Sequence, residues 1–355
     1  MPSNPHRKTS MADVAKAAGV SEATVDRVLN GRGGVARDKE ARVLEWARKL
    51  KLDRALGAVP ARWLRIAILM QQPAAPYFVS LKRGFELAQQ SFEAQRAICA
   101  VTYFDSLDPA CIVDTIHRAT QKADALVMVA YEHPDISAAV RKLSPVIPVV
   151  TLASDLPGTG RLAYVGIDNR GAGRVAGELM GRFLGDAGGQ VLVITGMHDF
   201  LAHEERENGF RSVLRRWFPR CDIVETVESF ERPERTERLT RDTFARYPDL
   251  RGIYNISAGD EGISAALHAL NRARSTVLIG HELNQASRRL LMEGTLDAVI
   301  DQNPVAEATR AVQLILRHYH REHGAAARRA KHHGSSRVAS MILANGQSYR
   351  CRRGR

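Results

Sequence analysis

The amino-acid sequence predicts an N-terminal all-α domain, followed by a larger α/β domain that is divided into two lobes with parallel sheets. Two patterns lead to this prediction. Between residues 10 and 50, apolar side chains recur at helical spacing among capping and turn residues. From Arg65 onwards, short apolar runs alternate with amphipathic stretches, as expected for parallel strands that are connected by helices.

Composition narrows the class of protein. The chain has 355 residues, of which 45% are hydrophobic and 25% charged, and this ordinary globular balance leaves room for two or three domains. No apolar run approaches the roughly 18 residues that a membrane helix needs, and the polar start lacks the apolar stretch of a secretory signal. We therefore expect a cytoplasmic protein that has no membrane partner.

The positive charge is concentrated at the two ends of the chain. The formal net charge is +12, and residues 1–60 hold 12 Lys and Arg against 7 Asp and Glu, while residues 317–355 hold 10 against 1. A basic end on a near-neutral body fits a polyanionic partner, because neutralised phosphates release their counterions. For the C-terminal run we prefer the simpler interpretation that its arginines keep the segment solvated.

Three short helices are predicted in the first fifty residues. Ser10 and Asp13 have capping-box spacing, and Gly19 supplies a turn because glycine accepts positive φ. Ser21 caps a second helix that ends near Asn30-Gly31, and a third helix runs from about Ala36 to Leu50. The inward-facing apolar positions are Met11, Val14, Ala15, Ala18, Val25, Val28, Leu29, Val43, Leu44, Ala47 and Leu50.

Two short helices that are joined by a glycine turn and braced by a third form a helix-turn-helix, which sets its second helix in the major groove of DNA. Arg27 can donate two hydrogen bonds to guanine O6 and N7, and Ala23 can lie against a thymine methyl group. Glu22 also projects from the first turns, while Ser21 and Thr24 suit phosphate oxygens. The alternative, a three-helix bundle for protein contacts only, leaves this polar face unexplained.

The order and spacing of these residues resemble the DNA-binding signature of the Lac repressor (LacI/GalR) family. The matching segments are Asp13-Val14-Ala15, Ala18-Gly19-Val20-Ser21, Thr24-Val25 and Arg27-Val28-Leu29-Asn30. The resemblance implies base readout by Glu22, Ala23 and Arg27. It implies phosphate anchoring by Ser21, Thr24 and Asn30. Asp26 departs from the pattern, because the family usually has Ser there and a carboxylate would repel phosphate.

Residues 52–63 form a linker, since Gly57 and Pro60 break any long helix. In the resembling family a hinge helix forms here on DNA, and a Leu from each subunit enters the minor groove. Leu56 is the nearest candidate for this wedge, although the family's usual hinge pattern is not visible. The alternative is that Leu56 packs against the body.

The body alternates about ten apolar β-type runs with turns or helices, and this exceeds one comfortable core, so we expect two sheets in two lobes. Helices are expected over 77–92, 108–122 and 135–143. The strand runs are 65–70, 97–103, 125–130, 148–153, 163–167, 190–195, 223–228, 252–257, 276–281 and 297–301.

This region resembles the type I periplasmic sugar-binding-protein fold, which the same family uses as its effector domain. The expected domains are a helix-turn-helix over 1–51, a hinge over 52–63, a body over 64–345 and a basic tail over 346–355. Lobe 1 takes about 64–167 and 301–322, and lobe 2 about 168–300 and 336–345. The resemblance implies three crossings between the lobes, with a late return near Ala298 to Pro304.

Ligands of such sheets bind beyond the carboxyl ends of the strands, which places the expected effector site between the lobes. Tyr77 and Phe78 can stack on a sugar ring there, and Asp155 also follows a strand. The resemblance implies ligand contacts by Arg206, Gln302 and Glu282, the last where the family usually has Asp. The family often carries an Asn-Asp pair before a helix at this place. The pair is absent here, and Asp260 is expected to substitute for it from a loop that is shifted along the sequence. For each residue alone, a helix cap or a salt bridge between the lobes is the alternative.

No cofactor and no metal are expected. The glycines at 171, 173 and 177 lack the spacing of a dinucleotide fingerprint, and close helix–sheet packing explains them more simply. Four histidines in an Arg-rich stretch offer no ordered ligand set, and the cysteines have no C-x-x-C spacing, so reduced thiols are expected. These residues are His320, His323, His332, His333, Cys99, Cys111, Cys221 and Cys351.

The sequence therefore predicts a DNA-binding transcriptional regulator, whose grip on double-stranded operator DNA is controlled by a small-molecule effector such as a sugar or polyol. A homodimer is expected because each helix-turn-helix reads one half-site, and a tetramer stays open. The resemblance favours a repressor. Two alternatives are a sugar-processing enzyme with a DNA-binding head, and a DNA-binding architectural protein without an effector.

Overall fold

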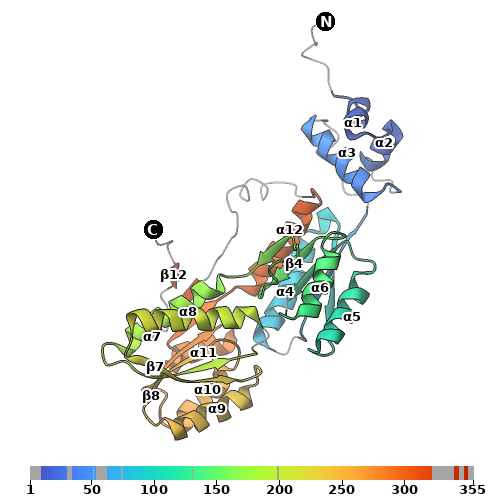
Figure 1. The fold of residues 1–355 in the computed structure, drawn as a ribbon. Coiled ribbons are helices and arrows are strands. Elements are labelled where there is room, and N and C mark those ends of the chain that lie inside the picture. Colours follow the sequence, from blue (N-terminus) through green and yellow to red (C-terminus); the bar gives the residue numbers. More distant parts are fainter. Residues whose placement is uncertain are drawn as a thin grey trace.

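The computed structural model of the chain describes residues 9–29, 34–50, 52, 62–72, 75–129, 131–197, 200–321, 340–343 and 348–350. These residues form a three-helix N-terminal domain and two α/β lobes (Figure 1). No helix in these ranges is long and apolar enough to cross a membrane.

The N-terminal helices begin and end where the sequence predicts. Ser10 and Asp13 form the capping box, in which the Ser10 Oγ atom accepts from the Asp13 amide at 3.3 Å. Gly19 ends the first helix in the left-handed conformation with a φ of 65°. The helices enclose their own apolar core, which includes Val14, Val25 and Val43. Their bounds are α1 Met11–Ala18, α2 Glu22–Leu29 and α3 Arg37–Lys49.

Lobe 1 is built around a five-stranded parallel sheet in the order β2-β1-β3-β4-β5. Strand β1, which lies between β2 and β3, is apolar from end to end except for Arg65, and this fits burial by helices on both faces. The elements of this lobe are β1 Leu64–Met70, α4 Pro76–Ser91, η2 Glu93–Gln95, β2 Ala97–Tyr103, α5 Pro109–Thr120, β3 Ala125–Val129, α6 Pro134–Leu143, β4 Val149–Leu152 and β5 Ala163–Val165.

Lobe 2 is built around a seven-stranded sheet in the order β12-β11-β10-β9-β8-β6-β7. The strands from β7 to β10 pair in parallel, whereas β11 and β12 pair antiparallel at one edge. The elements are α7 Asn169–Leu184, β6 Gly189–Thr195, α8 Leu201–Trp217, β7 Cys221–Glu228, α9 Pro233–Arg246, β8 Leu250–Asn255, α10 Asp260–Ala269, β9 Val277–His281, α11 Gln285–Glu293, β10 Ala298–Asp301, β11 Ser340–Leu343 and β12 Ser348–Arg350.

Alternate residues along the strands of the second sheet pack into two different cores. In β6, Val191 and Val193 belong to one core, while Leu192 and Ile194 belong to the other. This alternation follows from the two-residue period of a β-strand. Because both sets are apolar, both faces of the sheet are covered by helices, as the unbroken apolar runs predict.

The chain returns to lobe 1 after β10, as expected from the resemblance. Helix α12, Pro304–His318, packs on α4, where a Cβ atom on Gly84 would lie 2.8 Å from the Cβ atom of Ala308 (Figure 1). Its buried face, with Val312 and Ile315, completes the core of lobe 1. The strands β11 and β12 then belong to the sheet of lobe 2, so that sheet continues past the expected boundary at 345 to Arg350.

Glycines in α7 allow a close helix–helix contact rather than the helix–sheet packing that we expected. A Cβ atom on Gly173 would collide with the carbonyl oxygen of Arg206 in α8, and one on Gly177 would lie 2.9 Å from the carbonyl oxygen of Phe210. Helix α8 has Gly209 at the same crossing, where a Cβ atom would collide with the carbonyl oxygen of Arg170. The glycines therefore bring the backbone of Arg206 close to the axis of α7.

Candidate DNA-reading surface and interlobe cleft

Helix α2 presents the residues expected to read DNA on its outer face. Glu22, Ala23 and Arg27 are exposed, whereas Val25, Val28 and Leu29 are buried against α1 and α3. The Arg27 guanidinium makes no hydrogen bond or ion pair with any residue in the described ranges. Its donors are therefore available to a base edge.

Ser21 starts α2 and lies beside Thr24 on a basic depression. The Ser21 Oγ atom accepts from the Thr24 amide at 3.2 Å and lies 2.9 Å from the Thr24 hydroxyl. The same depression is lined by Lys16 from α1 and Lys39 from α3. Sequence reasoning missed these two lysines, because only the fold brings them next to the start of α2.

Two expected DNA contacts, Asn30 and the Leu56 wedge, lie outside the described residues. At the far end of the linker, Arg62 forms a 3.0 Å ion pair with the buried carboxylate of Asp124 in lobe 1. The Asp124 carboxylate also accepts from the Arg65 amide at 2.9 Å. The chain is thus anchored to the body where the linker ends.

A cleft of about 530 Å³ opens between the two lobes. Residues from the ends of β1, β3 and β4 line it on one side, and residues after β6, β7, β8 and β9 line it on the other. The structure brings together six of the seven expected effector residues on this cleft, namely Tyr77, Phe78, Arg206, Asp260, Glu282 and Gln302.

Arg206 reaches the cleft from the first half of α8 and is buried, with 3% of its surface exposed. Its Nε atom donates to Oδ1 of Asn169 at 2.8 Å, and one terminal nitrogen donates to the carbonyl of Ile256 at 2.9 Å. The guanidinium is therefore held by two neutral acceptors, and its other terminal nitrogen is left to face a ligand.

Glu282 and Gln302 meet across the base of the cleft. The Gln302 side-chain amide donates to Oε1 of Glu282, and the Ser287 hydroxyl donates to the Glu282 carbonyl at 2.8 Å. Burial raises the pKa of Glu282 to about 7, because a carboxylate loses its hydration there. The Oε1 atom of Gln302 has no hydrogen-bond partner among the described residues.

Asp260 begins α10 directly after Gly259, which has a φ of 118°. The Asn255 side chain donates to Oδ1 of Asp260 at 2.7 Å and to the Ser257 carbonyl at 2.9 Å. Burial raises the pKa of Asp260 to about 7, against the lowering effect of Asn255. The Asp260 carboxylate thus lies on the wall of the cleft.

Tyr77 and Phe78 start α4 on the lobe 1 side. Their rings meet edge to face with centroids 5.2 Å apart. The Tyr77 hydroxyl donates to Oε2 of Glu307 in α12 at 2.8 Å, and burial raises the pKa of Glu307 to about 8. Glu307 is therefore a buried acid directly behind the cleft wall, which sequence reasoning missed.

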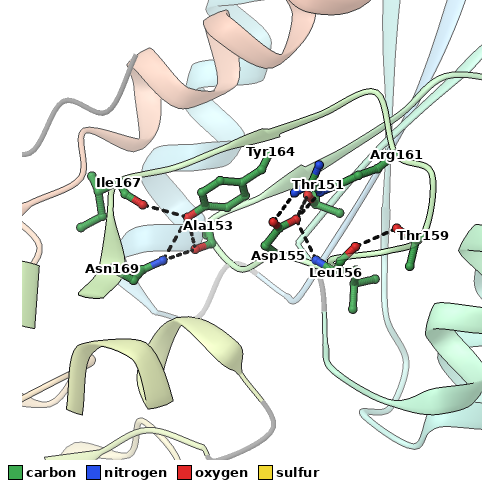
Figure 2. A network of polar contacts seen from close by, with 9 residues as sticks. All are labelled: Thr151, Ala153, Asp155, Leu156, Thr159, Arg161, Tyr164, Ile167 and Asn169. Carbon is green, nitrogen blue, oxygen red and sulfur yellow. Dashed lines mark hydrogen bonds and ion pairs between the residues drawn. The ribbon is translucent and has the colours of Figure 1, made fainter. Parts of the chain in front are cut away.

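Asp155 does not reach the cleft. Its carboxylate is taken up by Arg161, by the Thr151 hydroxyl at 2.7 Å and by the Leu156 amide at 2.8 Å (Figure 2). These hydrogen bonds hold the pKa of Asp155 below its usual value despite partial burial. Asp155 instead pairs with Arg161 of the same lobe, so it is neither a cleft residue nor a salt bridge between the lobes.

A separate network in Figure 2 joins the two lobes at the first crossing. The Tyr164 hydroxyl lies 3.0 Å from the carbonyl of Ala153 and 3.1 Å from that of Ile167, and it accepts from Nδ2 of Asn169 at 3.0 Å. Asn169 also donates to the Ala153 carbonyl at 3.3 Å. Since its Oδ1 atom holds Arg206, one amide connects the lobe 1 backbone to the cleft arginine.

The sequence analysis missed many residues that line the cleft, among them the following five. Phe230 and Glu231 follow β7, both with positive φ, and the strand-end rule alone would have found them. Burial raises the pKa of Glu231 to about 7. His281 ends β9, where its Nε2 atom lies 2.9 Å from the Tyr254 hydroxyl. The remaining two are Phe200 and His203.

The cleft contains no obvious metal site. Within the part of the chain that the structure describes, no group of three or more His, Cys, Asp or Glu side chains could hold a metal ion. Of the four C-terminal histidines, only His320 lies in the described ranges.

Comparison with known proteins matches both parts of the chain. Residues 66–321 match the periplasmic binding protein domain, and residues 10–52 match the bacterial regulatory proteins of the lacI family. The ribose operon repressor of Bacillus subtilis (strain 168) is 26% identical over 274 residues, which cover 75% of this chain and 78% of the repressor. The transcriptional regulator DegA of the same organism is 26% identical over 213 residues, covering 58% and 61% of the two chains.

Solved structures show the same fold for the body. The glucose-galactose binding protein GanP of Geobacillus stearothermophilus superposes with a TM-score of 0.70 at 19% identity. The superposition covers 80% of this chain and 98% of that protein.

Proposed function

Because the chain belongs to the periplasmic binding protein domain family and carries a lacI-family domain at its N-terminus, we propose that it is a DNA-binding transcriptional regulator controlled by an effector in the interlobe cleft. A polar reading helix and a buried ligand cleft in one chain support this function. The ribose operon repressor matches 75% of this chain and the transcriptional regulator DegA matches 58%, and both are named as regulators.

On the DNA side, Glu22, Ala23 and Arg27 read base edges. Ser21, Thr24 and Asn30 hold the phosphates, and Leu56 is the wedge for the minor groove. The protein acts as a homodimer in the cytoplasm, since one head reads only half of a two-fold operator.

On the effector side, a sugar, polyol or related metabolite lies between Tyr77 and Phe78 on one lobe and Arg206, Asp260 and Glu282 on the other. Gln302, at the crossing from β10 to α12, contacts it from below. A ligand that bridges both lobes favours the closed cleft, and its differential affinity for the two states limits the change in DNA binding to about 5- to 150-fold.

Selection of genomic fragments by the purified protein at moderate salt tests the DNA function. We expect a few fragments to be enriched over scrambled duplex, and equal binding to both would refute it. A thermal-shift screen of sugars and polyols, repeated with the selected operator, then tests effector control. No response to any compound would favour an architectural protein.

The direction of control is a separate proposal. We propose repression, so deletion of the gene raises expression of a reporter under the selected operator. Lower expression in the deletion strain would instead indicate an activator. We also propose that the protein is not an enzyme, and turnover of a bound sugar would contradict this.

A further inference from the structure

The interior of the cleft carries more acid than base. Four carboxylates and two guanidinium groups line it. Glu261 is neutralised from outside by Arg289 at 3.1 Å, and Arg232 is exposed at the rim. The interior thus holds Glu231, Asp260 and Glu282 with Arg206 as its cation.

Arg206 does not neutralise these acids by direct pairing. Its hydrogen bonds go to the Asn169 side chain and to the Ile256 carbonyl, and it forms no ion pair within 4.0 Å with a carboxylate of the described residues. The hydrogen bonds of Glu282 and Asp260 come instead from the neutral amides of Gln302 and Asn255. These three acids therefore have no direct cationic partner among the described residues.

Buried acceptor atoms point to the same kind of ligand. Gln302 is 6% exposed and lines the cleft, and its amide nitrogen donates to Oε1 of Glu282. Its Oε1 atom is therefore a fixed acceptor, and it has no partner among the described residues. A ligand that presents N–H or O–H donors would remove the cost of leaving it unpaired.

The remaining wall is aromatic. Phe78 comes from lobe 1, whereas Phe200 follows β6 of lobe 2 and packs against the lobe 1 core. Phe230 is 44% exposed, and the Arg235 guanidinium lies 4.8 Å from the centroid of its ring. Aromatic faces attract cations through the ring quadrupole and also cover the apolar face of a sugar ring. Acids opposite aromatic rings complement a compound that has both a positive group and an apolar face.

We propose that the effector carries a protonated amino group, as in an amino sugar or an aminated polyol, and that Glu282 and the Gln302 Oε1 atom accept its N–H donors. This rests on the proposed function, because it takes the cleft as the effector site. Glu231 and Asp260 contribute the remaining negative charge.

Calorimetry of the full-length protein with matched compounds tests the proposal. The pairs are D-glucose and D-glucosamine, D-galactose and D-galactosamine, D-mannose and D-mannosamine, and D-sorbitol and 1-amino-1-deoxy-D-sorbitol. We expect the amine of at least one pair to bind about tenfold or more tightly than its hydroxyl counterpart. Equal or tighter binding of the neutral members, or no binding by any amine, overturns the proposal.

Charge-removing variants locate the effect. Glu282→Gln keeps the size of the side chain and is expected to abolish the preference for the amine, while Glu231→Gln weakens it. Asp249→Asn, an exposed carboxylate in the same lobe, serves as the matched control. An unchanged preference in folded Glu282→Gln and Glu231→Gln would exclude these carboxylates as the cause.

The outcome for the regulator is read separately, from DNA selection with the same preparation. If a neutral sugar binds and changes DNA affinity, the proposed function remains intact, but the proposal that the effector carries an amino group is refuted. If the protein shows no selectivity among DNA fragments, the proposed function is refuted, whichever compound binds in the cleft.

Discussion

Two arginines carry the proposed contacts with DNA and with the effector, and their surroundings differ in the way that these proposed roles require. Arg206 is buried and held by two hydrogen bonds, so its position is fixed before a ligand arrives. Arg27 is exposed and unconstrained, so it can adjust to a base edge. The lysines at 16 and 39 add charge without fixed geometry, which suits phosphates.

Arg27→Ala should relax base preference at one operator position. The loss of a bidentate contact costs about 1–3 kcal/mol at that base pair. Binding to the selected operator and to its single-base variants measures this effect. Unchanged discrimination at every position would remove Arg27 from the readout.

Lys39→Ala should weaken binding to all sequences by a similar factor. Because it removes one phosphate contact per head, the slope of log affinity against log salt should fall by about 1 for each contact that is lost. Lys142→Ala, in helix α6 of lobe 1, is the control. A sequence-dependent loss in Lys39→Ala would contradict a pure phosphate role.

At the scale of elements, the strand and helix pattern could be predicted because it depends on local periodicity and capping. Ser10, Gly19 and the apolar runs each carry their own signal. Tertiary contacts could not be predicted this way. Glu307 appears as one acid in an amphipathic helix, and only the return of α12 to lobe 1 places it behind Tyr77. Asp155 has the right position after a strand, but Arg161, six residues further on, takes its carboxylate.

Gly173→Ala should destabilise the body and disturb the cleft together. The added methyl group has no space against the Arg206 carbonyl, so α7 and α8 must separate, and overpacking of this kind costs about 1–3 kcal/mol. Thermal unfolding and effector calorimetry measure the two effects. Gly171→Ala is the control, because its Cβ atom would meet only the Asp168 side chain, at 3.0 Å. Equal losses in both variants would argue against the helix contact.

At the scale of the whole molecule, polar groups join the two lobes, beside the Phe200 ring, which follows β6 of lobe 2 and packs into the lobe 1 core. Asn169 connects the lobe 1 backbone to Arg206, and Glu282 in lobe 2 adds to the burial that raises the pKa of Glu307 in lobe 1. Buried acids of this kind oppose the unliganded state when they ionise. Stability without effector is therefore linked to pH.

Stability of the unliganded protein should fall as the pH rises from about 6 to about 8. The folded state raises the pKa of Glu307 from 4.5 to about 8, so the stability from its bound proton is fully present below 4.5 and is lost as the pH approaches 8. Glu307→Gln should flatten the dependence, since glutamine can still accept from Tyr77. Melting temperatures of both proteins, measured from about pH 6 to about pH 8, test this prediction. An equal change of melting temperature with pH in both proteins would contradict the role of Glu307.

The late return of α12 has a consequence for synthesis on the ribosome. The head has its own core and is complete after about fifty residues, whereas lobe 1 lacks a wall of its core until His318 has been made. At typical translation rates this interval is roughly ten to fifty seconds. Any nascent or truncated product that ends earlier would display a finished DNA reader attached to an unfinished sensor, and so would escape control by the effector.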